Sequence, residues 1–194
     1  MRIKKLILAF GLVGFLGGCI AQLPWAPDHK VQRAVYKHNA PPSVTLMTVI
    51  ANDSGSAGHS ALLINGSQRV IYDPAGTWYN FDVPERADLL YGISPKFLQY
   101  YLDYHARKRF HVVMQTKTLS LAAADGLIRN AIENGASFSG MCAANTSKLL
   151  AQTPGFAGFP VGLFPKNAVK AFATVPGVTT RKIFQDDEGK DLKE

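Results

Sequence analysis

The distribution of apolar and polar residues along the chain predicts five short strands. Runs rich in β-branched and other apolar residues, bounded by Gly, Asn, Asp and Ser, are typical of strands in a buried or half-buried sheet. Two of these runs flank Asn65-Gly66, and Asn-Gly between apolar runs favours a tight hairpin. The expected strands cover residues 43–50, 59–64, 68–72, 110–115 and 178–184.

Start and stop signals between these runs predict helices. Ser94 precedes Pro95 in the pattern of a helix N-cap followed by proline in the first turn, and Ser120 is a second expected cap. Gly135 is expected to end the helix that Ser120 begins. The expected helices cover about residues 95–107, 120–134 and 138–151, with a short one starting at residue 165.

The order of these elements predicts the fold class. Strands and a hairpin come first, followed by a helix, another strand and further helices, which favours an α+β domain with an antiparallel sheet and helices packed beside it. Residues 77–93 are aromatic and irregular, and no internal repeat is present. We expect one domain over residues 43–185 and a frayed charged tail over residues 186–194.

The N-terminus has the pattern of an export signal. Arg2, Lys4 and Lys5 precede a short apolar run that is too short for a permanent membrane span. Cys19 follows Leu-Gly-Gly directly, and this resembles bacterial lipoprotein signals, whereas a plain secretory signal is the alternative. The resemblance implies a signal peptide over residues 1–18 and acylation of Cys19, which would anchor the protein to a membrane.

Position 20 and the following residues refine this expectation. Ile20 stands where an inner-membrane retention signal would place Asp, so the outer membrane, facing the periplasm, is the expected location in a host with two membranes. Residues 19–42 contain four prolines and are expected to be a tether that joins the domain near residues 31–36.

The formal charge of +7 falls to +4 without the three signal-peptide cations, and the remaining basic residues are dispersed, so nucleic-acid binding is not expected.

Cys142 is the other cysteine of the chain, and after acylation of Cys19 it is the one free thiol. An unpaired thiol in an exported protein is buried and inert, catalytic, or linked to another molecule. Cys142 stands at the expected start of a helix, where the helix dipole favours thiolate over thiol. Ser137, Ser139 or Gly140 could end the preceding loop and cap this helix.

Two upstream residues are candidate partners of this thiol. His59 opens the second expected strand among small neighbours, and it is either a general base for a cysteine or a histidine bonded to the backbone. A two-residue turn at Asn65-Gly66 would place residue 72 or 73 opposite His59, so Asp73 could orient the imidazole, or Asp73-Pro74 could be merely a turn.

The three segments 58–64, 72–76 and 140–144 together resemble the circularly permuted papain-like cysteine hydrolases. This group includes relatives of NlpC-type cell-wall peptidases and of lecithin:retinol acyltransferase. The resemblance implies a permuted papain-like fold with Cys142 as nucleophile, His59 as base and Asp73 as orienting residue. Many members have Asn before the cysteine, where this chain has Met141.

The resemblance and the expected location together imply a cysteine hydrolase of the cell envelope, a thiol peptidase or amidase. Its expected substrate is an amide bond of the peptidoglycan stem peptides, and no cofactor is expected. The alternatives are a lipid amide or ester hydrolase or acyltransferase, and a non-catalytic lipoprotein that uses the same fold for binding. His105 and His111 lack zinc spacing with Cys142 and are not expected in the site. Residues 78–81 and Tyr91 either line a substrate cleft or belong to the core.

Overall fold

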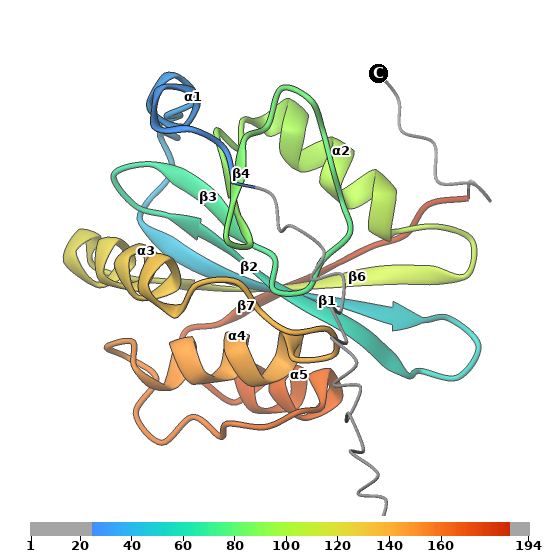
Figure 1. Ribbon diagram of the computed structural model, residues 1–194. Coiled ribbons are helices and arrows are strands. Elements are labelled where there is room, and N and C mark those ends of the chain that lie inside the picture. Colours follow the sequence, from blue (N-terminus) through green and yellow to red (C-terminus); the bar gives the residue numbers. More distant parts are fainter. Residues whose placement is uncertain (1–24, 187–194) are drawn as a thin grey trace, which may run out of the picture.

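The computed structural model describes residues 25–186 of the chain, and Figure 1 shows their arrangement around one sheet. The strands are joined in the order β4-β5-β3-β2-β1-β6-β7, and every neighbouring pair is antiparallel. The α+β class with an antiparallel sheet is therefore confirmed. The strands are β1 (Ser43–Ala51), β2 (Ala57–Asn65), β3 (Arg69–Tyr72), β4 (Glu85–Arg86), β5 (Leu89–Tyr91), β6 (Phe110–Thr118) and β7 (Thr179–Ile183).

The helices begin where the capping signals placed them in two cases. The Ser94 hydroxyl accepts a hydrogen bond from the Phe97 N–H, and the Ser120 hydroxyl accepts one from the Ala123 N–H. Gly135 follows the second of these helices with a φ of 70°, a conformation that suits glycine. The helices are α1 (Asp28–Arg33), α2 (Pro95–His105), α3 (Leu121–Asn134), α4 (Cys142–Ala151) and α5 (Pro165–Ala173).

Two short strands, β4 and β5, lie in the segment that the sequence pattern left irregular. They are two and three residues long, too short for a period-two pattern to show. The turn that joins them contains Ala87 and Asp88 at φ values of 49° and 66°. Neither residue is a glycine or asparagine, so the usual signal for such a turn is missing.

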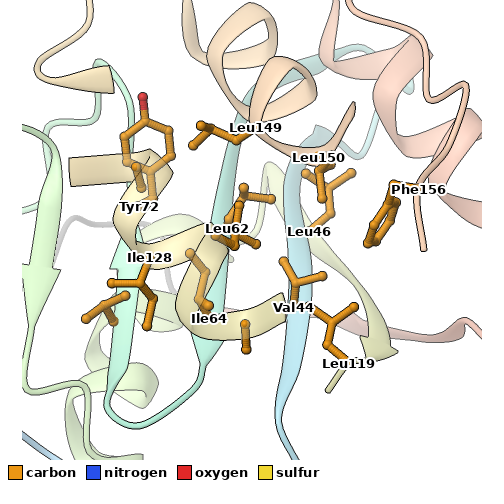
Figure 2. Packing of buried hydrophobic residues seen from close by; sticks show 14 of the residues in the cluster. Val44, Leu46, Leu62, Ile64, Tyr72, Leu119, Ile128, Leu149, Leu150 and Phe156 are labelled. Atoms are coloured by element: carbon orange, nitrogen blue, oxygen red, sulfur yellow. The ribbon is translucent and has the colours of Figure 1, made fainter. Parts of the chain in front are cut away.

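The sheet buries a different cluster of apolar residues on each face. One cluster lies under α3, α4 and α5 and contains the residues labelled in Figure 2, among them Leu62, Ile64 and Tyr72. The other lies under α2 and residues 77–93 and includes Ala61, Leu63 and Ile71. Since successive residues of a regular strand point to opposite faces, this division assigns a face to residues 59–65 of β2 and to every position of β3.

The N-terminal part of the described chain is in contact with the sheet edge. Arg86 of β4 forms an ion pair of 2.7 Å with Asp28 and lies 5.0 Å from the ring centre of Trp25. Val31 and Ala34 pack against the cluster under α3. Trp25 is thus held against the domain six positions after Cys19, which itself lies outside the described residues.

Candidate active site

His59 is positioned by an irregularity in strand β2. Val49 of β1 pairs with His59, but the next residue of β1, Ile50, pairs with Ala57, so Gly58 is an extra residue in β2. Such a β-bulge bends the strand and redirects the neighbouring side chain, and bulges are common beside active sites. The small residue before His59 is therefore where the bulge forms.

Strand β3 is too short to cover this part of β2. It ends at Tyr72, which pairs with Leu62, so residues 57–61 of β2 pair with β1 alone. Beside this stretch the sheet is open, and helix α4 packs against β2. Groups from the two faces of the sheet can therefore meet next to His59.

Asp73 reaches His59 although the expected register is wrong. The connection from β2 to β3 spans residues 66–68, with the Gly66 N–H bonded to the Gln68 carbonyl, instead of the expected two-residue turn. Tyr72 therefore faces Leu62 and not His59. Asp73 follows Tyr72 and lies diagonally across from His59 on the same face, which is within reach of long side chains. Its Oδ1 is 2.6 Å from His59 Nε2.

The Asp73 carboxylate is buried and held by further contacts. The Tyr101 hydroxyl of α2 donates a hydrogen bond of 2.8 Å to Oδ1. Gly76 approaches the carboxylate so closely that a Cβ there would lie 1.9 Å from Asp73 Oδ2. Burial alone would raise the pKa of Asp73, but its hydrogen bond and attraction to His59, with smaller contributions from His105 and Tyr101, lower it overall.

Cys142 is the first residue of α4 and is buried. The residue before it, Met141, occupies the N-cap position without a side-chain hydrogen bond, so the expectation that Ser137, Ser139 or Gly140 caps this helix is wrong. Backbone N–H groups of the first turn are unpaired within a helix, so the sulfur lies where negative charge is favoured.

The electrostatics of the pair favour the charged forms, the Cys142 thiolate and the His59 imidazolium, over those of isolated side chains. Burial would raise the pKa of Cys142, but the hydrogen bond and positive charge of His59 lower it, as do the Ser60 N–H and hydroxyl. Burial would lower the pKa of His59, but hydrogen bonds to Asp73 and Cys142 raise it overall. Because Asp73 occupies Nε2, Nδ1 is the ring nitrogen that remains for the sulfur.

Asp88 holds together the two loops that carry the site. Its carbonyl accepts from the Asp73 N–H at 2.8 Å, and its Oδ2 accepts from the Ser137 N–H at 2.7 Å and the Ala75 N–H at 3.4 Å. The loop after β3 and the loop before α4 are thereby tied to one buried carboxylate. Asn145, by contrast, bonds to Asn134 and to the Met141 carbonyl, which are contacts within the scaffold.

Three residues of the site were not expected from the sequence: Ser60, Tyr101 and His105. His105 was not expected in the site because it lacks zinc-ligand spacing with Cys142. Its ring stacks on that of His59, with ring centres 5.7 Å apart and an angle of 9° between the planes. Tyr101 and His105 are four positions apart on α2 and so share one helix face. The spacing of four residues is visible in the sequence, but the sequence does not tell which helix face packs over His59.

A cavity of about 290 Å³ opens beside His59 and His105. Its remaining lining comes from the loop after Asp73, the end of α2 and the facing ends of β1 and β6: Val49, Ala75, Gly76, Thr77, Tyr104, Arg107 and Phe110. The aromatic stretch is not part of it. Trp78 and Tyr91 are core residues, whereas Tyr79 and Phe81 line a separate hollow of about 550 Å³ next to Trp25.

The described residues contain no group of three His, Cys, Asp or Glu that could hold a metal ion. His29, His38 and His111 are not among the residues that line the cavity. Within residues 25–186, no helix is long and apolar enough to cross a membrane.

Comparisons of this chain with protein-family models, with curated proteins and with solved structures give no match.

Proposed function

We propose that the protein is an envelope-anchored cysteine hydrolase that cleaves an amide bond. The observation that carries the proposal is the arrangement of His59, whose Nε2 is held by Asp73 while Cys142 lies close enough to the ring for each group to shift the pKa of the other. A nucleophile, a base and an orienting carboxylate in this order form the working unit of acyl transfer on several unrelated folds.

In the proposed reaction, the Cys142 thiolate attacks the substrate carbonyl carbon. The backbone N–H of Cys142 supplies part of the stabilisation of the resulting oxyanion. The imidazolium of His59 gives its proton to the leaving amine, and a thioester remains on Cys142. His59 then takes a proton from water, the hydroxide attacks the thioester, and the thiolate leaves. Asp73 holds the ring orientation and stabilises the imidazolium throughout.

The proposed substrate class is the stem-peptide amides of peptidoglycan, in keeping with a protein anchored in the cell envelope. A second candidate is an amide or ester of a membrane lipid. It is favoured by the short stretch of chain between Cys19 and Trp25, the first residue held against the domain. Six positions separate Cys19 from Trp25, which spans at most about 20 Å when fully extended. Acylation of Cys19 would thus keep the domain close to the bilayer surface. Hydrolysis of isolated sacculi, compared with hydrolysis of phospholipid vesicles, separates the two candidates.

The test of the nucleophile is the pH dependence of Cys142 alkylation in the full-length protein and in His59→Ala. Mass spectrometry of the peptide that contains Cys142 excludes any contribution from Cys19. Because its pKa is lowered, Cys142 should react at pH values well below 8.5, the usual pKa of a free thiol. In His59→Ala this low-pH reactivity should disappear. A slow reaction that the substitution leaves unchanged would instead indicate a non-catalytic lipoprotein.

A further inference from the structure

His105 is a second histidine beside the base, and the proposed reaction does not use it. It is the last residue of α2, its ring lies parallel to that of His59, and it forms part of the cavity wall. His59 lines this cavity and Cys142 does not, so His105 would contact the part of a substrate that extends from Cys142 past His59 into the cavity. Its hydrogen-bonding character therefore bears on the choice of substrate.

The tautomer of His105 follows from its contact with the helix. Nδ1 lies 2.8 Å from the Tyr101 carbonyl oxygen, and a carbonyl can only accept, so Nδ1 carries the hydrogen. The pKa of His105 is lowered to about 4, chiefly by burial. The positive charges of His59 and Arg107 lower the pKa further, whereas attraction to Asp73 and the bond to the Tyr101 carbonyl raise it. The ring is accordingly neutral at pH 7, and Nε2 has a free lone pair.

Nε2 has no hydrogen-bond donor within residues 25–186. Among the other polar side chains of the wall, the Thr77 and Tyr104 hydroxyls bond each other at 2.9 Å, and the Arg107 guanidinium lies over the Tyr104 ring, 5.0 Å from its centre. His105 thus presents an acceptor that cannot become a donor without breaking its bond to the helix or taking up a proton. A ligand that fills the cavity satisfies it with an N–H or an O–H group.

We propose that His105 is a specificity-determining residue whose Nε2 accepts a hydrogen bond from a substrate N–H next to the scissile carbonyl. This inference rests on the proposed role of Cys142 as nucleophile. An amide supplies the N–H, whereas an ester places an oxygen lone pair against the nitrogen lone pair. A site built to bond an N–H discriminates against an analogue that lacks it, because its own acceptor is then left unpaired. The substrate class is therefore secondary amides in preference to esters.

The test uses two small alkylating probes on the full-length protein, 2-chloro-N-methylacetamide and methyl chloroacetate. Their rates at Cys142 are each divided by their rates with free cysteine, which removes the intrinsic difference in reactivity. We expect His105→Phe, which keeps a stacking ring but has no acceptor, to lower the amide-to-ester rate ratio by about five-fold, the size of one hydrogen bond. His105→Gln places a carbonyl oxygen near the position of Nε2 and should restore most of the ratio.

His111→Phe is the matched control. His111 is also stacked on an aromatic ring, Phe184, with centres 4.6 Å apart, but it lies outside the cavity. Its replacement should leave the amide-to-ester ratio unchanged. An unchanged ratio in His105→Phe, in a protein whose Cys142 still depends on His59, would overturn the inference and leave the proposed function standing. Loss of the His59 dependence itself would overturn the proposed function instead.

A second measurement needs no folded variant. In the wild-type protein labelled with ¹⁵N-histidine, N-methylacetamide should shift the resonance of an unprotonated Nε2, and methyl acetate at the same concentration should not. Equal shifts with both compounds, or none with either, would contradict a hydrogen bond from an amide N–H.

Discussion

The two faces of the sheet are covered by different numbers of helices and carry different chemistry. Under α3, α4 and α5, the helices bury apolar side chains such as Leu127, Leu150 and Phe172. Under α2, the single helix buries Leu98 and Leu102 but also turns Tyr101 toward Asp73 and His105 toward His59. The first face is an ordinary core, whereas the second combines a core with titratable groups and an adjoining cavity.

The candidate site takes one reacting group from each face. Cys142 comes from α4, and its position depends on how that helix packs. His59 and Asp73 point to the α2 face, where Tyr101 bonds the carboxylate. The two meet beside residues 57–61, where β3 has already ended. We infer that packing on the α4 face fixes the position of the sulfur, while groups on the α2 face lower the pKa of the thiol.

The largest expected effect comes from matched core deletions on the two faces, Leu127→Ala in α3 and Leu102→Ala in α2. Both leucines are at most 3 % exposed, so each substitution should lower the free energy of unfolding by about 2–5 kcal/mol. Because Leu102 adjoins Tyr101, only its deletion should also shift the pH midpoint of Cys142 alkylation upward. Urea unfolding and alkylation profiles of the full-length variants measure the two effects.

An equal shift of the alkylation midpoint in both leucine variants would break the division between the faces. It would mean that general loosening of the core, rather than the α2 contacts, controls the thiolate. Profiles are compared at a temperature where both variants remain folded, as judged by circular dichroism.

Asp73→Asn is expected to have the next largest effect, because it keeps the shape and an acceptor but removes the charge. We expect the free energy of unfolding at pH 7 to fall by about 1–2 kcal/mol, the difference between charged and neutral hydrogen bonds. The alkylation midpoint of Cys142 should rise, since an imidazolium without its carboxylate stabilises the thiolate less.

The pH dependence of that loss has a definite sign. The pKa of Asp73 in the folded protein is lower than its ordinary value of 3.8, so the carboxylate stabilises the fold above that pH and loses this effect as the pH falls. The difference between wild type and Asp73→Asn should therefore shrink when urea unfolding is repeated at pH 3. Asp53→Asn, in the exposed loop after β1, is the control. It should change neither the free energy of unfolding nor the alkylation midpoint of Cys142. A constant difference between pH 7 and pH 3 would contradict the assignment.

The elements of this fold were predictable where a local signal set them. Ser94 and Ser120 start helices through their own hydroxyls, and the β-branched run of β1 follows from side-chain type alone. The strands β4 and β5 were not predictable, because their pairing depends on a turn at Ala87 and Asp88 that the surrounding structure holds at positive φ. Tertiary contacts outweigh residue preference there.

The candidate site was predictable in three of its members, Cys142, His59 and Asp73, but not in its geometry or in the residues that surround them. The lone thiol, the histidine and the aspartate could be chosen from residue type and order. The register could not, because the β2–β3 connection starts one residue later and is one residue longer than expected, which shifts every pair by three positions, and Asp73 reaches His59 on the diagonal instead. Contributions from α2 depend on which face that helix covers, and no local pattern in its sequence states this.

The smallest expected effect tests whether the α4 face also contributes to the charge. Ser60 lies on β2 next to His59 but points to the opposite face, where its hydroxyl is 3.2 Å from Thr146 Oγ1. The Thr146 hydroxyl donates to the Cys142 carbonyl at 2.9 Å, so the single Ser60 hydroxyl hydrogen goes either to Thr146 Oγ1 or to the sulfur of Cys142. Ser60→Ala removes this donor but keeps the backbone N–H, so the alkylation midpoint should rise by less than one pH unit, or about 1 kcal/mol.

Ser147→Ala is the matched control for this substitution. Ser147 is also a buried serine on the α4 face, but its hydroxyl donates to the Ala143 carbonyl at 2.6 Å and makes no bond to the sulfur. It should leave the alkylation midpoint in place. If Ser60→Ala also leaves the midpoint unchanged, the Ser60 hydroxyl bonds Thr146 alone. The thiolate is then stabilised by the α2 face and by the start of helix α4. If the midpoint rises only in Ser60→Ala, both faces of the sheet stabilise the thiolate, and the division between them is one of degree.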